Sequence, residues 1–488
     1  MTLRPSLLAS FFLFGLLGAC GPDGRHGGVL TGTCDPGDKR ECYGGVDGTE
    51  GTGPCHSGEQ TCGADALWGP CDGQVAPAQE LCGDNVDNNC NGMVDENADM
   101  DGDGITTCGG DCCDSTECGS PALVNAGAFD VAGDGVDNDC NGVVDDSTPL
   151  CDQGLASNSA NGLDYAKAMD ICQTATMTEK KWGVISAEFS LADGTGMPAA
   201  IARSIRPKFG NGVLPRGGTS LVLLSTGAAA GQGDTNPAYQ DFQDGGDLLG
   251  DGNGTESAFP QDFVAANGGM LPNAPGCPEP LGDTANDPIM LTLTVRVPTN
   301  ARSFKFATNF FSSEFPEYTC SRFNDFFVAL LDSASMANPP DKNLAVYTGN
   351  GSKYPVGVNL ASGNTGLFTQ CVNGSTGCSG TGGSISTCTG TDQLAGTGLD
   401  TPDSGSCDSN SVEGGGTGWL ETSGNVNPGE IMKLRIAIWD TSDHALDSIA
   451  VVDGFQWSVE GAEPGTVILR EAAQGTEPSA PQASFLAE

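Results

Sequence analysis

The stretch MLTLTVRVP, residues 290–298, decides the expected fold because its apolar and polar side chains alternate without a break. Strict alternation is the pattern of a β-strand with one buried and one hydrated face. Leu291, Leu293, Val295 and Val297 make up the apolar face. Working outward, the alternation continues in SFKFATNFF (303–311), DFFVALLD (325–332), KLRIAIWD (433–440) and IAVVDGFQW (449–457). Many such strands between glycine-rich turns favour an antiparallel sandwich. We therefore predict a mainly β fold, a large jelly-roll-like antiparallel β-sandwich over residues 151–462.

Helices are expected to be few and short. NGLDYAKAMDIC, residues 161–172, predicts one helix with Ala166, Met169 and Ile171 near one face. Roughly 300 residues is large for one sandwich, so long loops must decorate it. Residues 340–430, with four cysteines, are the main predicted decoration. The tail 463–488 is predicted to be mobile.

The composition is strongly acidic, with 63 acidic and 20 basic residues in 488 and a formal net charge of -43. Nucleic acid is excluded as a partner, because neutralising its phosphates requires Lys and Arg. Electrostatic binding to anionic lipid head groups is excluded for the same reason. Cations are the natural partners of such a surface.

The N-terminus predicts a lipid anchor. Arg4 precedes a short apolar segment, residues 6–17, and LGAC at 17–20 resembles a bacterial lipobox. Residues 1–20 are then a signal peptide, Cys20 carries the lipid, and 21–33 form a flexible tether. The chain has 21 cysteines, so removing Cys20 leaves an even number for disulfides in an oxidising envelope. By resemblance to Gram-negative lipoproteins, Gly21 favours the outer membrane. The alternative is an ordinary secretory signal.

Two further regions separate the tether from the sandwich. Residues 34–81 form a cysteine-rich module with almost no aliphatic run, so disulfides must staple it. Residues 82–150 contain an acidic phrase twice, GDNVDNNCNGMVDE (83–96) and GDGVDNDCNGVVDD (133–146), with ten of fourteen positions identical.

Each copy has the spacing of a calcium loop, in which alternate side chains turn toward one cation and Gly allows the sharp bend. The expected ligands of the first copy are Asp87, Asn89, Asn91, the Met93 carbonyl and Asp95. Those of the second are Asp137, Asp139, Asn141, the Val143 carbonyl and Asp145. Val94 and Val144 are expected to anchor the loops against their neighbours.

The usual closing Glu is missing from both copies. Ala98 and Thr148 occupy its place, so Glu96, Asp146 or Asp99 must complete the shell. Without that Glu, the expected affinity is weak, at ~10⁻⁴–10⁻³ M.

A third acidic stretch, DMDGDGITTCGGDCCD at 99–114, resembles thrombospondin type 3 and dockerin-like calcium loops. Asp99, Asp101 and Asp103 are its leading ligands, with Asp111 and Asp114 behind them. Hard oxygen ligands suit calcium better than zinc or copper. The alternative for all three stretches is a solvated acidic linker held by disulfides.

Both copies, with GGDCCDS between them, resemble the metal-binding motif named after the surface protein MopE. The larger region resembles the choice-of-anchor L domain, through KWGVISAEFSLADGT (181–195), FFSSEFPEYTCSRFNDFFVALL (310–331), GGTGWLETSG (415–424) and LRIAIWDTSDHALDSIAVVDGFQW (434–457). The resemblance implies an anchored bacterial surface protein with a β-rich extracellular domain. It implies no activity.

Acidic residues at strand ends predict a second, tentative calcium site in the sandwich, formed by Glu314, Asp325, Asp440 and Asp453. The alternative is that these residues are ordinary solvated loop acids.

Catalysis has little support, because the sequence contains no HExxH, GxSxG or P-loop. His444, beside Asp443 and Asp447, is the only candidate base, and a surface-turn role is expected for it. We therefore predict a non-enzymatic, lipid-anchored cell-surface protein with a calcium-binding stalk. Its head would bind an extracellular protein or glycan. The alternatives are a glycan hydrolase using paired carboxylates, such as Glu314 and Glu317, and a passive envelope component.

Overall fold

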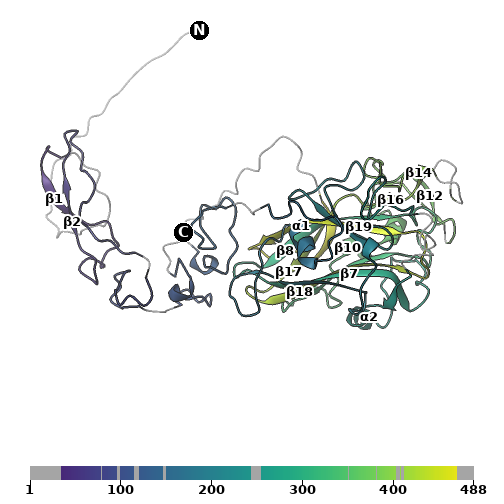
Figure 1. Ribbon diagram of the computed structural model, residues 1–488, viewed down its shortest axis with the longest axis horizontal. Helices are drawn as coiled ribbons and strands as arrows, with labels where there is room; N and C mark the ends of the chain where they lie inside the picture. Colours follow the sequence, from purple (N-terminus) through teal and green to yellow (C-terminus); the bar gives the residue numbers. More distant parts are fainter. Residues whose placement is uncertain are drawn as a thin grey trace, which may run out of the picture. The chain divides into compact units, whose positions relative to one another are not determined.

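The computed structural model describes residues 34–78, 80–95, 99–114, 120–146, 150–242, 254–349, 351–380, 382–402, 407 and 412–469. Cys20, the tether, Glu96 and residues 470–488 lie outside these ranges. The chain divides into two compact units, Met1–Ala98 and Asp99–Glu488 (Figure 1). The boundary falls inside the region 82–150 that the sequence predicted as one domain, so each copy of the acidic phrase belongs to a different unit.

The first unit depends on disulfides. Its regular structure is one antiparallel pair, β1 (Lys39–Cys42) with β2 (Gly58–Thr61). The buried hydrophobic side chains in its described part are Cys55, Cys62 and Cys90. Three bridges join Cys34 to Cys62, Cys42 to Cys71 and Cys55 to Cys90. The last bridge ties the first acidic copy to the cysteine-rich module.

The second unit is built on two antiparallel sheets, which confirms the predicted fold class (Figure 1). One sheet has the order β3 (Gly183–Ser190), β7 (Thr284–Arg296), β18 (Ile431–Thr441) and β9 (Phe326–Asp332), and β6 (Glu256–Ala258) also pairs with β7. The other has the order β20 (Gly465–Ile468), β17 (Leu420–Asn425), β8 (Ser303–Ser312), β19 (Ser448–Ser458), β5 (Leu221–Ser225) and β4 (Arg203–Arg206), and β16 (Gly415–Gly416) also pairs with β8.

Three small hairpins decorate the sandwich. They pair β10 (Val346–Gly349) with β11 (Ser352–Pro355), β12 (Gly374–Thr376) with β13 (Gly383–Ile385), and β14 (Thr401–Pro402) with β15 (Val412–Glu413). Disulfides join Cys371 to Cys388 and Cys378 to Cys407, within the decoration that the sequence predicted.

The main core lies between the sheets. Leu291, Leu293 and Val295 of β7 are fully buried in it, as alternation predicted, and Phe304 and Phe306 of β8 join them. Burying these side chains is the chief stabilising term of the unit, at about 1.5–3 kcal/mol for each large one.

The expectation of one hydrated face is wrong for β9, which ends the smaller sheet beside β18. In β9 the inner residue Phe327 and the outer residues Phe326, Val328 and Leu330 are all buried. The outer face is covered because Phe263, from helix α2 (Gln261–Ala266), packs against it in a second apolar cluster.

The predicted helix 161–172 is shorter than expected. Helix α1 (Gly162–Ala168) begins after Asn161, whose side chain accepts a hydrogen bond from the Leu163 amide. It ends before Asp170, which has a φ of 70°. The other described helices are α2 and short 3₁₀ turns at Thr107–Gly109, Pro121–Leu123, Ala200–Ala202 and Val358–Gly363.

The predicted mobile tail begins too early. Residues 465–468 form β20, which pairs with β17 at the edge of the larger sheet. Three more bridges in this unit join Cys112 to Cys140, Cys151 to Cys172 and Cys277 to Cys320, and Cys108 and Cys113 are also in disulfides, as is Cys82 of the first unit. Within the described ranges, no helix combines the length and apolar character needed to cross a membrane.

Candidate metal sites

The two acidic copies share one backbone conformation. Cys90 and Cys140 both have a φ of 59°, and Asp95 and Asp145 have φ values of 50° and 51°. One of the four sequence differences follows from this conformation. Asn85 in the first copy and Gly135 in the second both have positive φ, at 60° and 77°, and Gly and Asn are the residues that tolerate it best.

Side chains at alternate positions fold back over their own loop. Asp137 accepts hydrogen bonds from the Asn141 amide at 3.1 Å and the Gly142 amide at 2.8 Å. Asp139 Oδ1 accepts from the Asn141 amide, and Asn141 Oδ1 from the Val143 amide.

The first copy repeats these bonds. Asp87 accepts from the Asn91 and Gly92 amides, both at 3.0 Å. The side-chain oxygens of Asn89 and Asn91 accept hydrogen bonds from the amides of Asn91 and Met93, respectively. The side chains at positions 87, 89 and 91 of the first copy, which are expected metal ligands, therefore make the same hydrogen bonds as those at positions 137, 139 and 141 of the second. A carboxylate that accepts two amides still has lone pairs for a cation.

A residue that the sequence reasoning missed bridges the two ends of each loop. Glu80 accepts the amides of Asn89 and Asp95, each at 3.2 Å. Asp130 does the same in the second copy, accepting the amides of Asn138 at 2.8 Å and Asp146 at 2.6 Å. Extending the repeat three residues upstream of the quoted phrase would have found this pair, because both positions are acidic.

Asp95 and Asp145, which are also expected ligands, make a further set of hydrogen bonds to the backbone. Asp95 Oδ1 accepts the amides of residues 83, 84 and 85, and Asp145 Oδ1 those of residues 133, 134 and 135. Each closes the turn that leads into its loop. Asp95 also lies in a three-carboxylate group with Glu80 and Asp84, whose oxygens are within 4.8 Å of one another.

The loop ends also differ from expectation. Val94 and Val144 do not anchor the loops, because 53% and 54% of their surfaces are exposed. Met93 and Val143, expected to offer carbonyls, also have exposed side chains. In the second copy Asp146 accepts a hydrogen bond from Asn141 Nδ2 at 3.0 Å, which brings the proposed closing carboxylate to a ligand side chain.

The third stretch brings five carboxylates together in two groups. Asp99, Asp101 and Asp103 form one, and Asp101, Asp111 and Asp114 form the other, each with oxygens within 4.8 Å. Asp101 belongs to both, and its Oδ2 is buried without a hydrogen-bond partner. The sequence predicted this grouping, although Asp99 was also considered as a ligand of the first loop.

Electrostatics favour a cation in this third group. Burial, reinforced by repulsion from Asp103, Asp101 and Asp114, raises the pKa of Asp111 to about 6. Burial is also the main cause that raises the pKa values of Asp101 and Asp103. A bound cation would remove this penalty on the ionised carboxylates.

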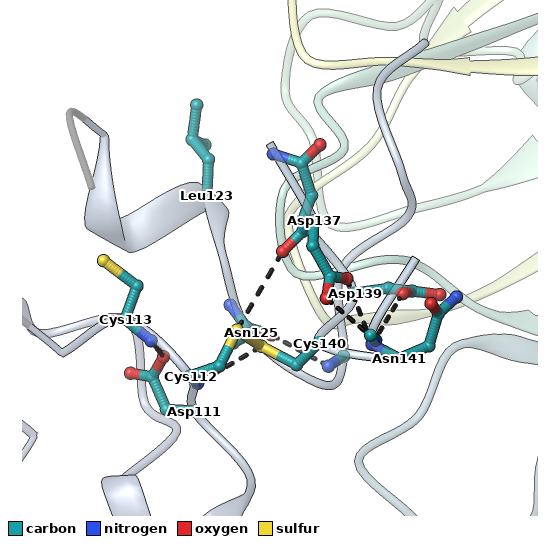
Figure 2. The surroundings of a disulfide bond; sticks show 12 residues. Asp111, Cys112, Cys113, Leu123, Asn125, Asp137, Asp139, Cys140 and Asn141 are labelled. Atoms are coloured by element: carbon teal, nitrogen blue, oxygen red, sulfur yellow. Dashed lines mark hydrogen bonds between the residues drawn. A yellow bond between two sulfur atoms is a disulfide. The ribbon is translucent and has the colours of Figure 1, made fainter. Parts of the chain in front are cut away.

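Asn125, which no pattern in the sequence singled out, joins the second loop, the third stretch and the sandwich. Its side chain donates to Asp103 Oδ2 at 2.6 Å and accepts from Thr299 Oγ1 at 2.6 Å, and its amide donates to the Asn138 carbonyl at 2.8 Å. Figure 2 shows Asn125 next to the Cys112–Cys140 bridge, which links the same two acidic segments.

The strand-end acids come together in part. Glu314, Asp325 and Asp440 form a buried group with oxygens within 4.8 Å. Asp453 does not join them, because its Oδ2 accepts the amides of Arg216 and Gly217 instead. His444 lies in the bend that follows β18, and its partners are Asp287 Oδ2, at 2.6 Å from Nδ1, and Glu256, at 3.3 Å from Nε2.

A polar cavity of about 650 Å³ opens on the outer face of the smaller sheet. Among its lining residues, Arg435 binds both oxygens of Asp262, at 3.0 and 2.6 Å, and reaches Asp332 at 3.3 Å. The Lys342 ammonium pairs with the same two aspartates. The hydrogen bonds from Arg435 are the main cause that holds the pKa of Asp262 well below its usual range.

Comparison with known families agrees with these observations. Residues 279–454 match the model of the choice-of-anchor L domain, so β7, β8, β9, β18 and the first part of β19 fall inside the match, whereas β3, β4, β5 and β20 fall outside it. Residues 72–96 and 120–146 match the family described as "Putative metal-binding motif", of the MopE type. No curated protein and no solved structure matches the chain. The chain therefore contains two segments that match the MopE-type metal-binding motif and one that matches the choice-of-anchor L domain, a combination that suggests a metal-binding protein of the cell surface.

Proposed function

We propose that the protein is a lipid-anchored component of the bacterial outer surface, whose acidic loops bind calcium and whose β-sandwich head binds an extracellular protein or glycan. The observation that supports the calcium loops best is the shared hydrogen-bond frame of the two copies. Loops that differ in sequence at four of fourteen positions keep the same bonds from their alternate side chains, as a common ligand would require.

The ligand chemistry favours calcium over the other metals. The candidate atoms are carboxylate, amide and carbonyl oxygens, which are hard ligands. The cysteines nearest to them, Cys90 and Cys140, are in disulfides and offer no thiolate for a soft metal. Magnesium demands near-ideal octahedral geometry, whereas calcium accepts six to eight oxygens in an irregular shell.

Replacing Asp137 with Ala should abolish calcium binding at the second loop and leave the first intact. Asp87→Ala should do the reverse, because each residue holds two amides of its own loop. At 100-fold over the dissociation constant, one occupied site stabilises the folded form by about 2.7 kcal/mol. Calorimetric titration of the full mature chain measures both effects. Asp283→Ala, which removes an exposed acid beside β7, is the control. A wild-type chain that gives no saturable heat with millimolar calcium contradicts the calcium assignment.

For the head, we propose binding and not hydrolysis. A glycosidase needs one protonated and one ionised carboxyl group beside the scissile bond. In the polar cavity, Asp262 and Asp332 are both paired with Arg435 and Lys342, and the hydrogen bonds from Arg435 hold the pKa of Asp262 well below its usual range, so Asp262 does not supply the protonated group. Glu314, which the sequence suggested together with Glu317 as a carboxylate pair for hydrolysis, is only 2% exposed, so a glycan cannot reach it.

Incubation with a panel of bacterial and plant polysaccharides should therefore release no reducing ends. If one of them binds in the polar cavity, Arg435→Met should weaken that binding by at least tenfold, because Arg435 lines the cavity and pairs with its two aspartates, Asp262 and Asp332. Lys39→Met, an exposed cation in the first unit, serves as the matched control. Release of reducing ends by the wild type that is lost in Asp332→Asn contradicts the proposal and supports the hydrolase alternative.

A further inference from the structure

Three carboxylates from separate strand ends meet at one end of the sandwich. Glu314 follows β8, Asp325 immediately precedes β9, and Asp440 lies near the end of β18. They are 2%, 0% and 2% exposed, and their oxygens lie within 4.8 Å of one another. We call these residues the head triad.

The head triad has few hydrogen-bond donors around it and no counter-charge. Within the described residues, none of the three takes part in an ion pair. Glu314 Oε2 accepts the Asp325 amide at 3.2 Å. Both carboxylate oxygens of Asp325 and Oδ1 of Asp440 are buried with no hydrogen bond of normal geometry.

Neighbouring groups make the surroundings more negative. Asp447 is 6% exposed, and repulsion from Asp325 and Asp287 adds to burial in raising its pKa. The nearby imidazole of His444 is bonded to Asp287 and Glu256 and not to the head triad.

A buried carboxylate without a donor or counter-charge costs several kcal/mol, so it must be either protonated or bound to a cation. Burial is the first cause that raises the pKa values of all three residues, and that of Asp325 reaches about 7. The geometry favours a cation, because the oxygens of the three residues lie within 4.8 Å of one another and both oxygens of Asp325 and Oδ1 of Asp440 have no partner.

We propose that the head triad is a calcium site, in which one ion is bound between Glu314, Asp325 and Asp440 and joins the two sheets of the sandwich. The joining follows from the topology, because β8 belongs to the larger sheet and β9 and β18 to the smaller. Three carboxylates supply three to six oxygens, depending on how many bind through both, and calcium takes six to eight. Magnesium retains several water molecules, which suits a buried site poorly.

The test uses the full mature chain, stripped of metal with EGTA, in wild-type form and as Asp325→Asn. Bound calcium is counted by elemental analysis after dialysis, and the melting temperature of the head is measured with EGTA and with millimolar calcium. Asp325→Asn should bind one equivalent less than the wild type. It should melt above the wild type in EGTA, because a buried charge has been removed, and below it in calcium, because a ligand has been lost.

Asp453→Asn is the matched control. Asp453 is equally buried but lies outside the head triad, so this variant should retain the full number of calcium equivalents. If Asp325→Asn does not fold, Glu314→Gln provides the same comparison. The proposal is overturned if the order of melting temperatures is the same in both conditions, or if the count is unchanged. It is also overturned if magnesium gives the same count and shift as calcium. Asp137→Ala should lower the number of bound calcium ions through the second loop, but it should not reverse the order of the melting temperatures in EGTA and in calcium. The two measurements together therefore distinguish the head triad from the acidic loops.

Discussion

Replacing Cys20 with Ser should move the protein completely from the membrane fraction to the soluble fraction. In the proposed anchor, the Cys20 sulfur carries the acyl chains, and each buried CH₂ contributes about 0.8 kcal/mol to membrane binding. A Ser at this position cannot form the thioether, and the acidic surface of the chain offers no second attraction to anionic lipids. Cell fractionation followed by intact-mass analysis of the mature protein measures both the location and the modification.

Gly21→Asp is the matched control for anchoring. It keeps the cysteine, so lipidation should persist, but its resemblance to inner-membrane lipoproteins predicts retention in the inner membrane. A Cys20→Ser protein that stays in the membrane fraction with the wild-type mature mass shows that the lipobox interpretation is wrong.

Reducing the disulfides should unfold the first unit and leave the core of the head folded. The described part of the first unit buries only three hydrophobic side chains, all of them cysteines, whereas the head has a continuous apolar core between its sheets. The three bridges span 28, 29 and 35 residues, and removing a bridge from a small domain costs about 2–5 kcal/mol. The combined free-energy cost of losing all three bridges exceeds the stabilisation that a unit with so few buried side chains can supply.

Limited proteolysis after graded reduction, read by mass spectrometry, measures this difference. Cleavages should appear first between residues 34 and 95, while fragments that contain β7, β8, β18 and β19 persist. The double variant Cys55→Ser/Cys90→Ser should reproduce the early cleavages around residues 83–95 without a reductant. Simultaneous loss of both units would show that the head also depends on its bridges.

The sequence was sufficient for the inner face of the sandwich, because alternation is a local property of a strand. Leu291, Leu293 and Val295 could be assigned from neighbouring residues alone. It was not sufficient for the outer faces, since the residues that cover them come from distant segments. Phe263 covers β9 from more than sixty residues away, and no periodicity within β9 indicates that its second face is dry.

The same distinction applies to the metal sites. The spacing of Asp137, Asp139 and Asn141 is local, and the loop they form could be predicted. The position of Asp95 could not, because its partners are amides of the incoming turn, which have no sequence signature. Asn125 is harder still, since its partners lie at 103, 138 and 299 and are brought together only by the folded chain.

The position of Cys140 inside its loop has a consequence for how the protein matures. During oxidation this cysteine meets four candidate partners between residues 108 and 118, and only Cys112 is the native one. An ion held by the surrounding carboxylates would fix the loop before the sulfurs react and so select the native isomer. Calcium in the envelope would then act as a template for correct pairing, and its scarcity would lower the yield of native protein through scrambled isomers.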